Sequence, residues 1–332
     1  MNITDKLERI QHALSALSVH ETECKLCPRE CGVNRKKEAK GFCQSGNQAF
    51  VSHTLLHYGE EPVLSGLSQG NTEKTDIPGQ LAGSGTIFFS GCNLKCLYCQ
   101  NYQLSWLNHG EQTADEELAM RMLELQEKSA LNINLVSPTH MLLPILRALR
   151  IAYAEGLHLP LVYNSNAYEK TEVIKCLDGI IDIYLPDLKY FSPELASRFS
   201  ETPDYFHHAK QVIQEMYCQQ PTLCLSKENV ATQGLIIRHL VLPGQTADSS
   251  AVLGWIAHNL SPYVCLSLMS QYNPCHKAPR EIQRGLSSEE YRTVRAKAEE
   301  LGFGTMFLQP EPFAQEDHLL PDFDLESPFQ WD

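Results

Sequence analysis

Hydrophobic positions along the chain follow first a helical period and then an alternation of strands and helices. The helical period comes first, over roughly residues 4–18, where apolar residues recur at spacings of three and four. Residues 45–85 are rich in Gly and Ser and show no clear period, so we expect mostly loop there. The opening pattern therefore predicts one amphipathic helix followed by an irregular segment.

From about residue 86 onward, short apolar runs alternate with longer helical stretches. The runs are Thr86–Ser90, Asn132–Val136, Leu159–Tyr163, Ile180–Leu185, Leu235–Leu242, Tyr263–Met269 and Thr305–Leu308. Predicted helices follow at about 140–155, 169–176, 248–259 and 288–301, and Thr113 with Glu116 reads as a capping box at the start of another. Near-continuous apolar strands are typical of a parallel sheet buried on both faces.

Six or seven such repeats predict an α/β barrel or a partial one. A doubly wound open sheet is the alternative, and periodicity alone does not separate the two. We expect a partial (β/α)6 TIM-like barrel with a small Cys-rich N-terminal extension. The expected division is 1–80 for the extension, 81–310 for the barrel and 311–332 for a C-terminal tail.

Composition narrows the class of protein. The 332 residues are 43% hydrophobic, which excludes a disordered chain, and 27 basic against 40 acidic residues give a formal charge of −13, which argues against a nucleic-acid scaffold. The charged N-terminus predicts no signal peptide, and no apolar run is long enough for a membrane span. We therefore expect a cytoplasmic protein without a membrane or nucleic-acid partner. Clustered cysteines in that compartment more often bind metal than form disulfides.

Three cysteines follow the first predicted strand of the repeats. Cys92, Cys96 and Cys99 are separated by three and then two residues. Three thiolates at this spacing can hold one face of a cubane iron–sulfur cluster, whose four irons ordinarily take four cysteines. One iron would then remain open to another ligand. A zinc site is less consistent with the spacing, because zinc sites usually take four ligands from paired CxxC units.

At these residues the chain resembles the radical SAM superfamily, whose signature is CxxxCx-aromatic-C after the first barrel strand. Tyr98 occupies the aromatic position. The resemblance implies a [4Fe–4S] cluster on Cys92, Cys96 and Cys99, with S-adenosylmethionine (SAM) on the open iron. Its reductive cleavage would give a 5′-deoxyadenosyl radical that abstracts hydrogen from a substrate, the protein supplying position and shielding from water.

The surrounding residues resemble the pyruvate formate-lyase activating enzyme-like branch, in a group with an N-terminal CxLCPRxCGVNR segment. The matching stretches are 24–35, 41–43, 57–66, 83–102, 187–189, 238–244 and 267–272. This branch implies a glycyl-radical enzyme as protein substrate and a flavodoxin- or ferredoxin-like electron donor. Another protein, a peptide or a small molecule remains an alternative substrate. A non-enzymatic iron–sulfur electron-transfer protein and an RNA-modifying radical enzyme are alternatives of other classes.

Polar residues that follow the predicted strands are candidates for contacts with SAM, because barrel sites lie at the C-terminal strand ends. The family's GGEP stretch, which holds the methionine amino group, corresponds here to 134–140, where its glycines and glutamate are absent. Arg238 is a charge within an apolar strand and needs a partner, either the SAM carboxylate or a structural carboxylate. The candidate cofactor-binding residues are Tyr98, Ser137, Thr139, Asn164, Asn166, Asp187, Lys189 and Arg238.

A second group of cysteines precedes the barrel. Cys24, Cys27, Cys31 and Cys43 provide four thiolates in a spacing that satisfies tetrahedral Zn²⁺, and they could equally hold a second iron–sulfur cluster. With all four bound, no coordination position stays open. We therefore expect a structural metal site, with zinc slightly favoured, in the N-terminal extension.

Overall fold

The fold is built on one curved sheet, seen in a computed structural model that describes residues 3–66, 83–310 and 320–329. Its strands run in the order β10-β9-β8-β6-β5-β4-β2-β1-β3, with β7 paired to β8. The strands are β1 Ala49–His57, β2 Ser84–Phe89, β3 Glu111–Thr113, β4 Ile133–Val136, β5 Leu161–Ser165, β6 Ile183–Pro186, β7 Cys224–Leu225, β8 Ala231–Leu240, β9 Cys265–Met269 and β10 Met306–Leu308.

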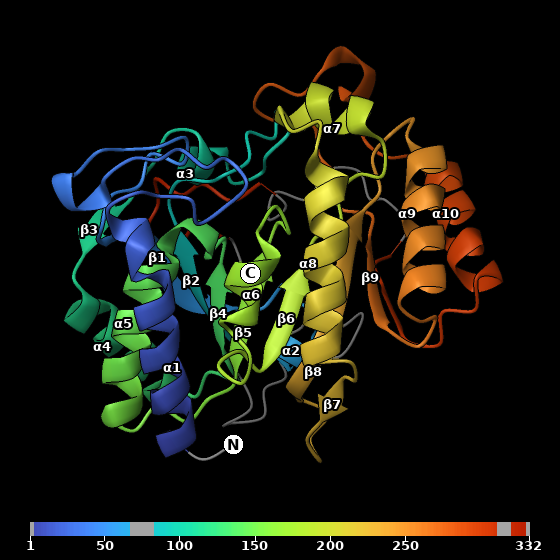
Figure 1. Cartoon of the computed structure of the whole chain (residues 1–332). Helices are drawn as coiled ribbons and strands as arrows, with labels where there is room; N and C mark the ends of the chain where they lie inside the picture. The colour runs from blue at the N-terminus through green and yellow to red at the C-terminus, as the bar shows by residue number, and fades with distance from the viewer. Residues whose placement is uncertain (1–2, 67–82, 311–319, 330–332) are drawn as a thin grey trace.

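Helices follow most of the parallel strands (Figure 1). The α-helices are α1 Ile3–Leu17, α2 Pro62–Ser65, α3 Tyr102–Ser105, α4 Asp115–Glu127, α5 Leu142–Ala154, α6 Thr171–Lys175, α7 Pro193–Ser200, α8 Tyr205–Gln219, α9 Thr246–Asn259 and α10 Ser288–Glu300. Short 3₁₀ turns are η1 Ser18–Glu21, η2 Arg35–Lys37, η3 Thr139–Met141 and η4 Arg280–Ile282.

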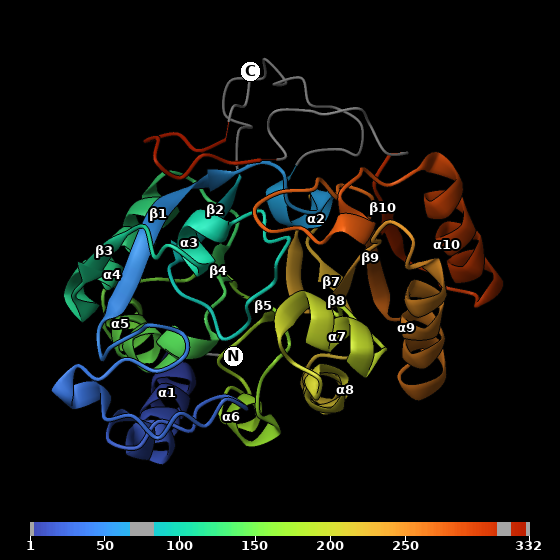
Figure 2. The ribbon, with the colours of Figure 1, turned by 90° about the horizontal axis from the view of Figure 1, so that it is seen from above.

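The sheet confirms the predicted α/β partial barrel. Strands β2, β4, β5, β6, β8, β9 and β10 are joined by parallel pairing, each to the next. Seen from above, they bend into an arc with helices along its outer side (Figure 2). Within the described residues the arc ends at β10 and β3, which do not pair with each other. The barrel is therefore open, and its strand order is sequential rather than doubly wound.

The two faces of the sheet have separate cores because side chains alternate along each strand. One set, which includes Ile133, Leu135 and Tyr163, packs against the surrounding helices. The alternate set, which includes Val162 and Ile183, packs against the short helix α2. Helix α2 therefore fills part of the space inside the arc.

Two expectations for the N-terminal half were wrong. The segment 45–85 was expected to be mostly loop, but its residues 45–66 hold β1, antiparallel to β2, and α2, while residues 67–82 lie outside the described residues. The capping box at Thr113 and Glu116 does not form, because Thr113 belongs to β3 and α4 begins at Asp115 after the N-cap Ala114. Residues 49–57 form a strand because they pair with β2. Their weakly alternating sequence does not by itself predict a strand.

The N-terminal segment is in close contact with the barrel. Helix α1, as predicted, is amphipathic and packs with Ile10 and Ala13 in the main core beside α5. The proposed boundaries at residues 80 and 311 lie outside the described residues. Within the described part, β1 extends the sheet of the barrel, and Phe323 of the tail packs on Phe88 of β2.

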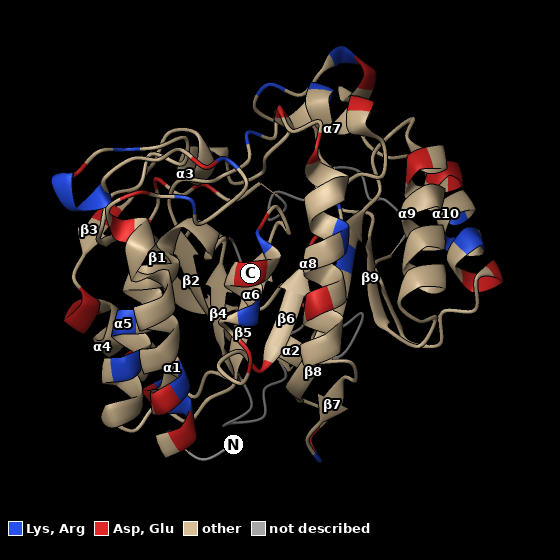
Figure 3. Cartoon of the chain, in the orientation of Figure 1, with Lys and Arg blue, Asp and Glu red and all other residues tan. Residues whose placement is uncertain are grey.

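Charged residues lie on the outer helices and on the loops that connect the elements. In the view of Figure 3, acidic and basic residues are interspersed on α1, α4, α8 and α10, while the strands carry few. Among the described residues, no helix has the length and apolar character needed to cross a bilayer.

Candidate functional site

The first cysteine group lies in the loop that leaves β2 at the carboxyl edge of the parallel strands. Gly91 begins this loop with φ of +82°, a left-handed conformation suited to glycine. Cys92 is buried, whereas Cys96 and Cys99 are partly exposed. The loop is held by backbone bonds from Gly91 N–H to the carbonyl of Leu104 and from Leu97 N–H to that of Phe199, at 3.0 and 2.8 Å.

Each of these three thiols receives a hydrogen bond from a polar side chain. Asn166 Nδ2 donates to Cys92 Sγ at 3.5 Å, Ser200 Oγ to Cys96 Sγ at 3.0 Å, and Ser105 Oγ to Cys99 Sγ at 3.2 Å. Hydrogen bonds to sulfur favour the thiolate form and are a recurring feature of iron–sulfur sites. The donors come from helices α3 and α7 and from the residue after β5, so three separate parts of the chain meet at this loop.

In the metal-free chain the thiols of Cys92 and Cys99 are poorly ionised. Burial, with a smaller contribution from the neighbouring Cys96, raises the pKa of Cys92 to about 11 and that of Cys99 to about 12. Lys189 acts in the opposite direction on both groups. Because a bound metal deprotonates its thiol ligands outright, loading of this loop releases protons.

Tyr98 points into the fold rather than into solvent. Its hydroxyl lies 2.7 Å from that of Tyr190, which lies 2.8 Å from Ser200 Oγ, the donor to Cys96. Burial raises the pKa of Tyr98 well above its usual value, so it stays protonated. Tyr98, at the aromatic position of the motif, therefore helps to position the loop through hydrogen bonds that link its hydroxyl group to that of Tyr190 and, through Tyr190, to that of Ser200.

Asn166 and Lys189 are the predicted cofactor-site residues that lie beside the thiols. Asn166 Nδ2 also donates to Asn93 Oδ1 at 2.8 Å, next to Cys92. Lys189 pairs with Asp187 at 2.7 Å, and its charge is felt by Cys92 and Cys99. The two residues that follow β6 thus form an ion pair at the edge where the cysteine loop lies.

The candidates after β4 and on β5 lie at the same edge of the sheet. Ser137 N–H donates to the Asn164 carbonyl at 2.9 Å, and Ser137 has a positive φ of 57°. Thr139 is buried beside Glu169, whose pKa is raised by burial. These three residues therefore belong to the polar edge of the sheet, while the side chains that donate to the thiols come from other positions of the described chain.

Arg238 has carboxylate partners within the protein. Its side chain pairs with Glu60 and with Glu61, the latter through contacts at 2.7 and 2.5 Å. Both glutamates are almost fully buried and come from the turn between β1 and α2. Burial opposes charge on Glu61, but the Arg238 guanidinium outweighs it and the pKa of Glu61 is lowered. Of the two interpretations of Arg238, the structure shows the pairing with structural carboxylates.

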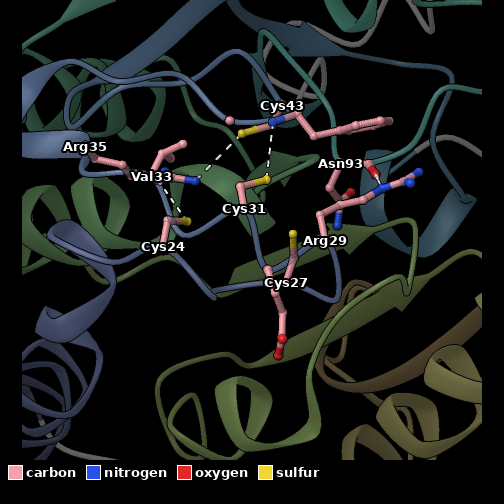
Figure 4. Close-up of a pocket in the computed structure, with 11 residues that line it drawn as sticks. Cys24, Cys27, Arg29, Cys31, Val33, Arg35, Cys43 and Asn93 are labelled. Carbon is pink, nitrogen blue, oxygen red and sulfur yellow. Dashed lines mark hydrogen bonds between the residues drawn. The ribbon is translucent and has the colours of Figure 1, made fainter.

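The second cysteine group surrounds a small pocket (Figure 4). Cys24, Cys27, Cys31 and Cys43 all line it, together with Arg35. Arg35 is buried and donates from Nε to Cys24 Sγ at 3.2 Å and from an Nη to Cys43 Sγ at 3.7 Å. Burial raises the pKa of Cys27 to about 12, and the three other thiols add to this shift.

In this structure the sulfur atoms of neither cysteine group converge on a common point. Among the described residues, no three His, Cys, Asp or Glu side chains come together closely enough to hold a metal ion as they stand. The donor sets nevertheless fit metals: each group contains only thiols, and nearby side chains donate hydrogen bonds to them.

Several contributors could not be identified from sequence. Ser105 and Ser200 belong to no sequence motif. Their hydroxyl groups lie beside the thiols only because the fold places α3 and α7 there. Glu60 and Glu61 could have been noticed in the sequence, because two adjacent acidic residues before Pro62 interrupt an apolar stretch. Arg35 lies in the CGVNR segment, yet its contacts with sulfur need the fold.

Comparison with curated proteins gives a relative of similar sequence over most of the chain. No model of a known protein family matches the chain. The uncharacterised protein MJ0674 of Methanocaldococcus jannaschii is 32% identical over 296 residues, covering 86% of this chain and 76% of that protein.

Solved structures give weaker likenesses. SuiB of Streptococcus suis bound to S-adenosylmethionine has a TM-score of 0.46 at 11% identity, over 66% of this chain and 48% of SuiB. HydG, a maturase of the [FeFe]-hydrogenase, has a TM-score of 0.44 at 12% identity, over 92% of this chain and 63% of HydG. The chain thus spans about half the length of SuiB. The extent and level of the match to MJ0674 show that this chain belongs to the MJ0674 family.

Proposed function

We propose that the protein is a radical SAM enzyme. The observation that carries this proposal is the loop after β2, where three cysteines spaced as CxxxCxxC lie at the carboxyl edge of an open parallel barrel. Each thiol there has its own hydrogen-bond donor. Three thiolates leave one iron of a [4Fe–4S] cluster without a protein ligand, which is the vacancy that SAM requires.

The cofactors supply the redox chemistry: when bound, the cluster and SAM provide reductive cleavage to a 5′-deoxyadenosyl radical able to abstract hydrogen. The chain's residues hold and shield them. Cys92, Cys96 and Cys99 are the proposed iron ligands. Ser105 and Ser200 support two of these sulfurs, and their hydrogen bonds lower the energy of the thiolate form.

Polar groups along the same edge are proposed to bind SAM. Asn166 and the Asp187–Lys189 pair lie beside the cysteine loop. Ser137, Thr139 and Asn164 extend the polar edge along β4 and β5. Arg238 is left out of this assignment, because two carboxylates already surround its guanidinium.

We propose a protein substrate, with a glycyl-radical enzyme as the first candidate and a flavodoxin- or ferredoxin-like protein as electron donor. In the described part of the chain the terminal strands β10 and β3 do not pair, and this supports the choice because a peptide loop needs a lateral entrance. Another protein, a peptide or a small molecule is the alternative substrate. The proposed compartment is the cytoplasm.

Anaerobic reconstitution tests the iron site directly. The wild-type chain should bind about four irons with matching sulfide, with the absorption and electron paramagnetic resonance of a [4Fe–4S] centre. Cys96→Ala should lose most of this iron, while Cys218→Ala, which removes an exposed thiol on α8, should keep it. No iron uptake by the wild type, or full uptake by Cys96→Ala, would overturn the assignment.

A further inference from the structure

We propose that Cys24, Cys27, Cys31 and Cys43 hold a single Zn²⁺ ion, and that this centre fixes the loop that carries Cys92. The zinc site goes beyond the proposed radical chemistry and does not depend on it. Its role in holding the loop is argued from contacts between the two segments.

Arg35 provides the electrostatic argument. Arg35 is only 4% exposed, and its guanidinium donates to the sulfurs of Cys24 and Cys43 and to the backbone carbonyls of Gly46 and His140, none of which carries a full negative charge while the thiols are protonated. Within the described residues it forms no salt bridge with a carboxylate. A buried cation without an anion is costly. Neutral thiols would leave Arg35 in that state, whereas metal-bound thiolates provide the missing negative charge.

The composition of the pocket favours one ion. The cavity between the side chains has space for about one water-sized sphere. Four thiolates and no open position match a structural Zn²⁺. Because the sulfurs do not yet converge on one point, binding must draw them together by side-chain rotation.

The zinc pocket shares a wall with the cysteine loop of the barrel. Asn93, next to Cys92, lines the pocket, and its carbonyl accepts a hydrogen bond from Arg29 Nε at 3.0 Å. A Cβ on Gly91 would lie 2.3 Å from the carbonyl oxygen of Cys43, so the two backbones are in direct contact.

A second link runs through buried side chains. Arg35, which contacts two thiols, also donates to the carbonyl of His140 at 2.5 Å. His140 Nε2 lies 2.8 Å from the carbonyl of Ser90, just before the cysteine loop. Zinc-bound thiolates in the pocket would therefore fix the position of Arg35. Arg35 in turn fixes the start of the cysteine loop through its hydrogen bond to His140.

Metal analysis separates this proposal from the radical SAM proposal. Chains expressed with zinc should contain about one zinc each, and Cys92→Ala/Cys96→Ala/Cys99→Ala should keep it, because those residues serve the other site. Cys31→Ser, at an exposed position, should bind Zn²⁺ at least about 100-fold more weakly in chelator competition. Cys218→Ala is the matched control and should bind zinc like the wild type.

Co²⁺ substitution checks the ligands, because tetrahedral thiolate coordination gives a distinct absorption spectrum in the triple variant. Zinc-free wild type, unaltered affinity in Cys31→Ser, or four additional irons with sulfide in the triple variant would each overturn the proposal. If only the radical SAM proposal were wrong, the protein would still contain one zinc, and iron would be absent from the other site.

Amide hydrogen exchange tests the link between the sites in the same triple variant, which contains no cluster. Removal of zinc by a chelator should increase exchange in residues 90–95 by about tenfold or more, equivalent to at least 1.4 kcal/mol of lost protection. Helix α9, which is remote in sequence and lies on the opposite flank of the sheet (Figure 2), serves as the internal control and should be unchanged. Equal exchange of residues 90–95 with and without zinc would overturn the proposed fixing of the loop.

Discussion

At Gly91 the backbones of the two cysteine segments are in direct contact. Its φ of +82° is unfavourable for other L-residues, and the space where a Cβ would lie is taken by the Cys43 carbonyl oxygen. Both restrictions act on the same atom. The glycine is therefore required by conformation and by packing together.

Gly91→Ala should destabilise the protein by about 2 kcal/mol or more, from left-handed strain plus the clash. Gly244→Ala is the control, because Gly244 has φ of +72° and the space that its Cβ would enter is open. It should cost about 1 kcal/mol from strain alone. Urea denaturation of both variants measures the difference, and equal losses would show that the contact with Cys43 is unimportant.

His140 should make stability depend on pH. Burial lowers its pKa from 6.5 to about 4, although its hydrogen bond to Ser90 acts the other way. The unfolded chain therefore takes up a proton first as the pH falls, and stability present above pH 6.5 is lost toward pH 4. This group alone should remove about 2 kcal/mol between pH 7 and pH 5.

His140→Gln keeps a donor for the Ser90 carbonyl but cannot titrate. Urea unfolding at pH 7 and pH 5 should show a smaller loss of stability in this variant than in the wild type. The same loss in both proteins would mean that His140 is not the titrating group.

At the residue scale, sequence spacing indicated which cysteines belong together, because the spacing of ligands is local, and four of them line one pocket. The donors to the sulfurs were not predictable. Ser105 and Ser200 lie in separate helices about a hundred residues apart in sequence, and only the fold brings them to the loop. Arg238 shows the same limit: its need for a partner was clear from the sequence, but Glu60 and Glu61 are distant along the chain.

At the element scale, α10 has the capping box that the sequence pattern wrongly placed before α4. Ser287 accepts from Glu290 N–H, and the Glu290 side chain accepts from Ser287 N–H at 3.0 Å. Glu290 also accepts from the Gly244 backbone, which ties the end of the β8 segment to the helix.

Ser287→Ala should therefore cost about 1 kcal/mol of unfolding free energy by loss of the cap. Ser288→Ala, one residue further into α10, is the control and should change stability by less than about 0.5 kcal/mol. Thermal denaturation monitored by circular dichroism compares the two. A Ser287→Ala protein as stable as its control would show that the cap contributes nothing.

Elements with strong periodicity were predictable and weakly patterned ones were not. Helix α1 and the parallel strands follow from their apolar spacing. Strand β1 mixes apolar and polar side chains without regular alternation, so its order comes from pairing with β2. The same tertiary effect places Thr113 in a strand instead of at a helix start.

At the scale of the whole molecule, a buried charge network crosses the inside of the arc. Arg238 on β8 pairs with Glu60 and Glu61 from the β1–α2 turn, and Asn134 on β4 donates to Glu60 at 2.9 Å. These contacts connect strands on both halves of the open barrel. The network thus links β4 and β8 through the β1–α2 turn.

Arg238→Met should destabilise the protein by about 3–5 kcal/mol, because it leaves two buried carboxylates without a counter-charge. Adding Glu60→Gln and Glu61→Gln to the same chain should restore part of the loss, since the uncompensated charges are then removed. Chemical denaturation tests both proteins. Arg238→Met with wild-type stability would contradict the role of this network.

The overall architecture followed from the alternation of strands and helices, but periodicity could not decide between an open barrel and a doubly wound sheet. Strand order decides it, and strand order depends on contacts between residues far apart in sequence. The covering of one sheet face by α2 was also beyond prediction, because α2 has only four residues.

The central claim is that the CxxxCxxC loop supports reductive cleavage of SAM. The direct measurement is 5′-deoxyadenosine formation by the anaerobically reconstituted protein with SAM and a one-electron reductant, followed by chromatography. Wild type and Cys218→Ala should both form it, and Cys99→Ala should form none. A wild-type protein that carries its iron–sulfur cluster and still forms no 5′-deoxyadenosine would contradict the account.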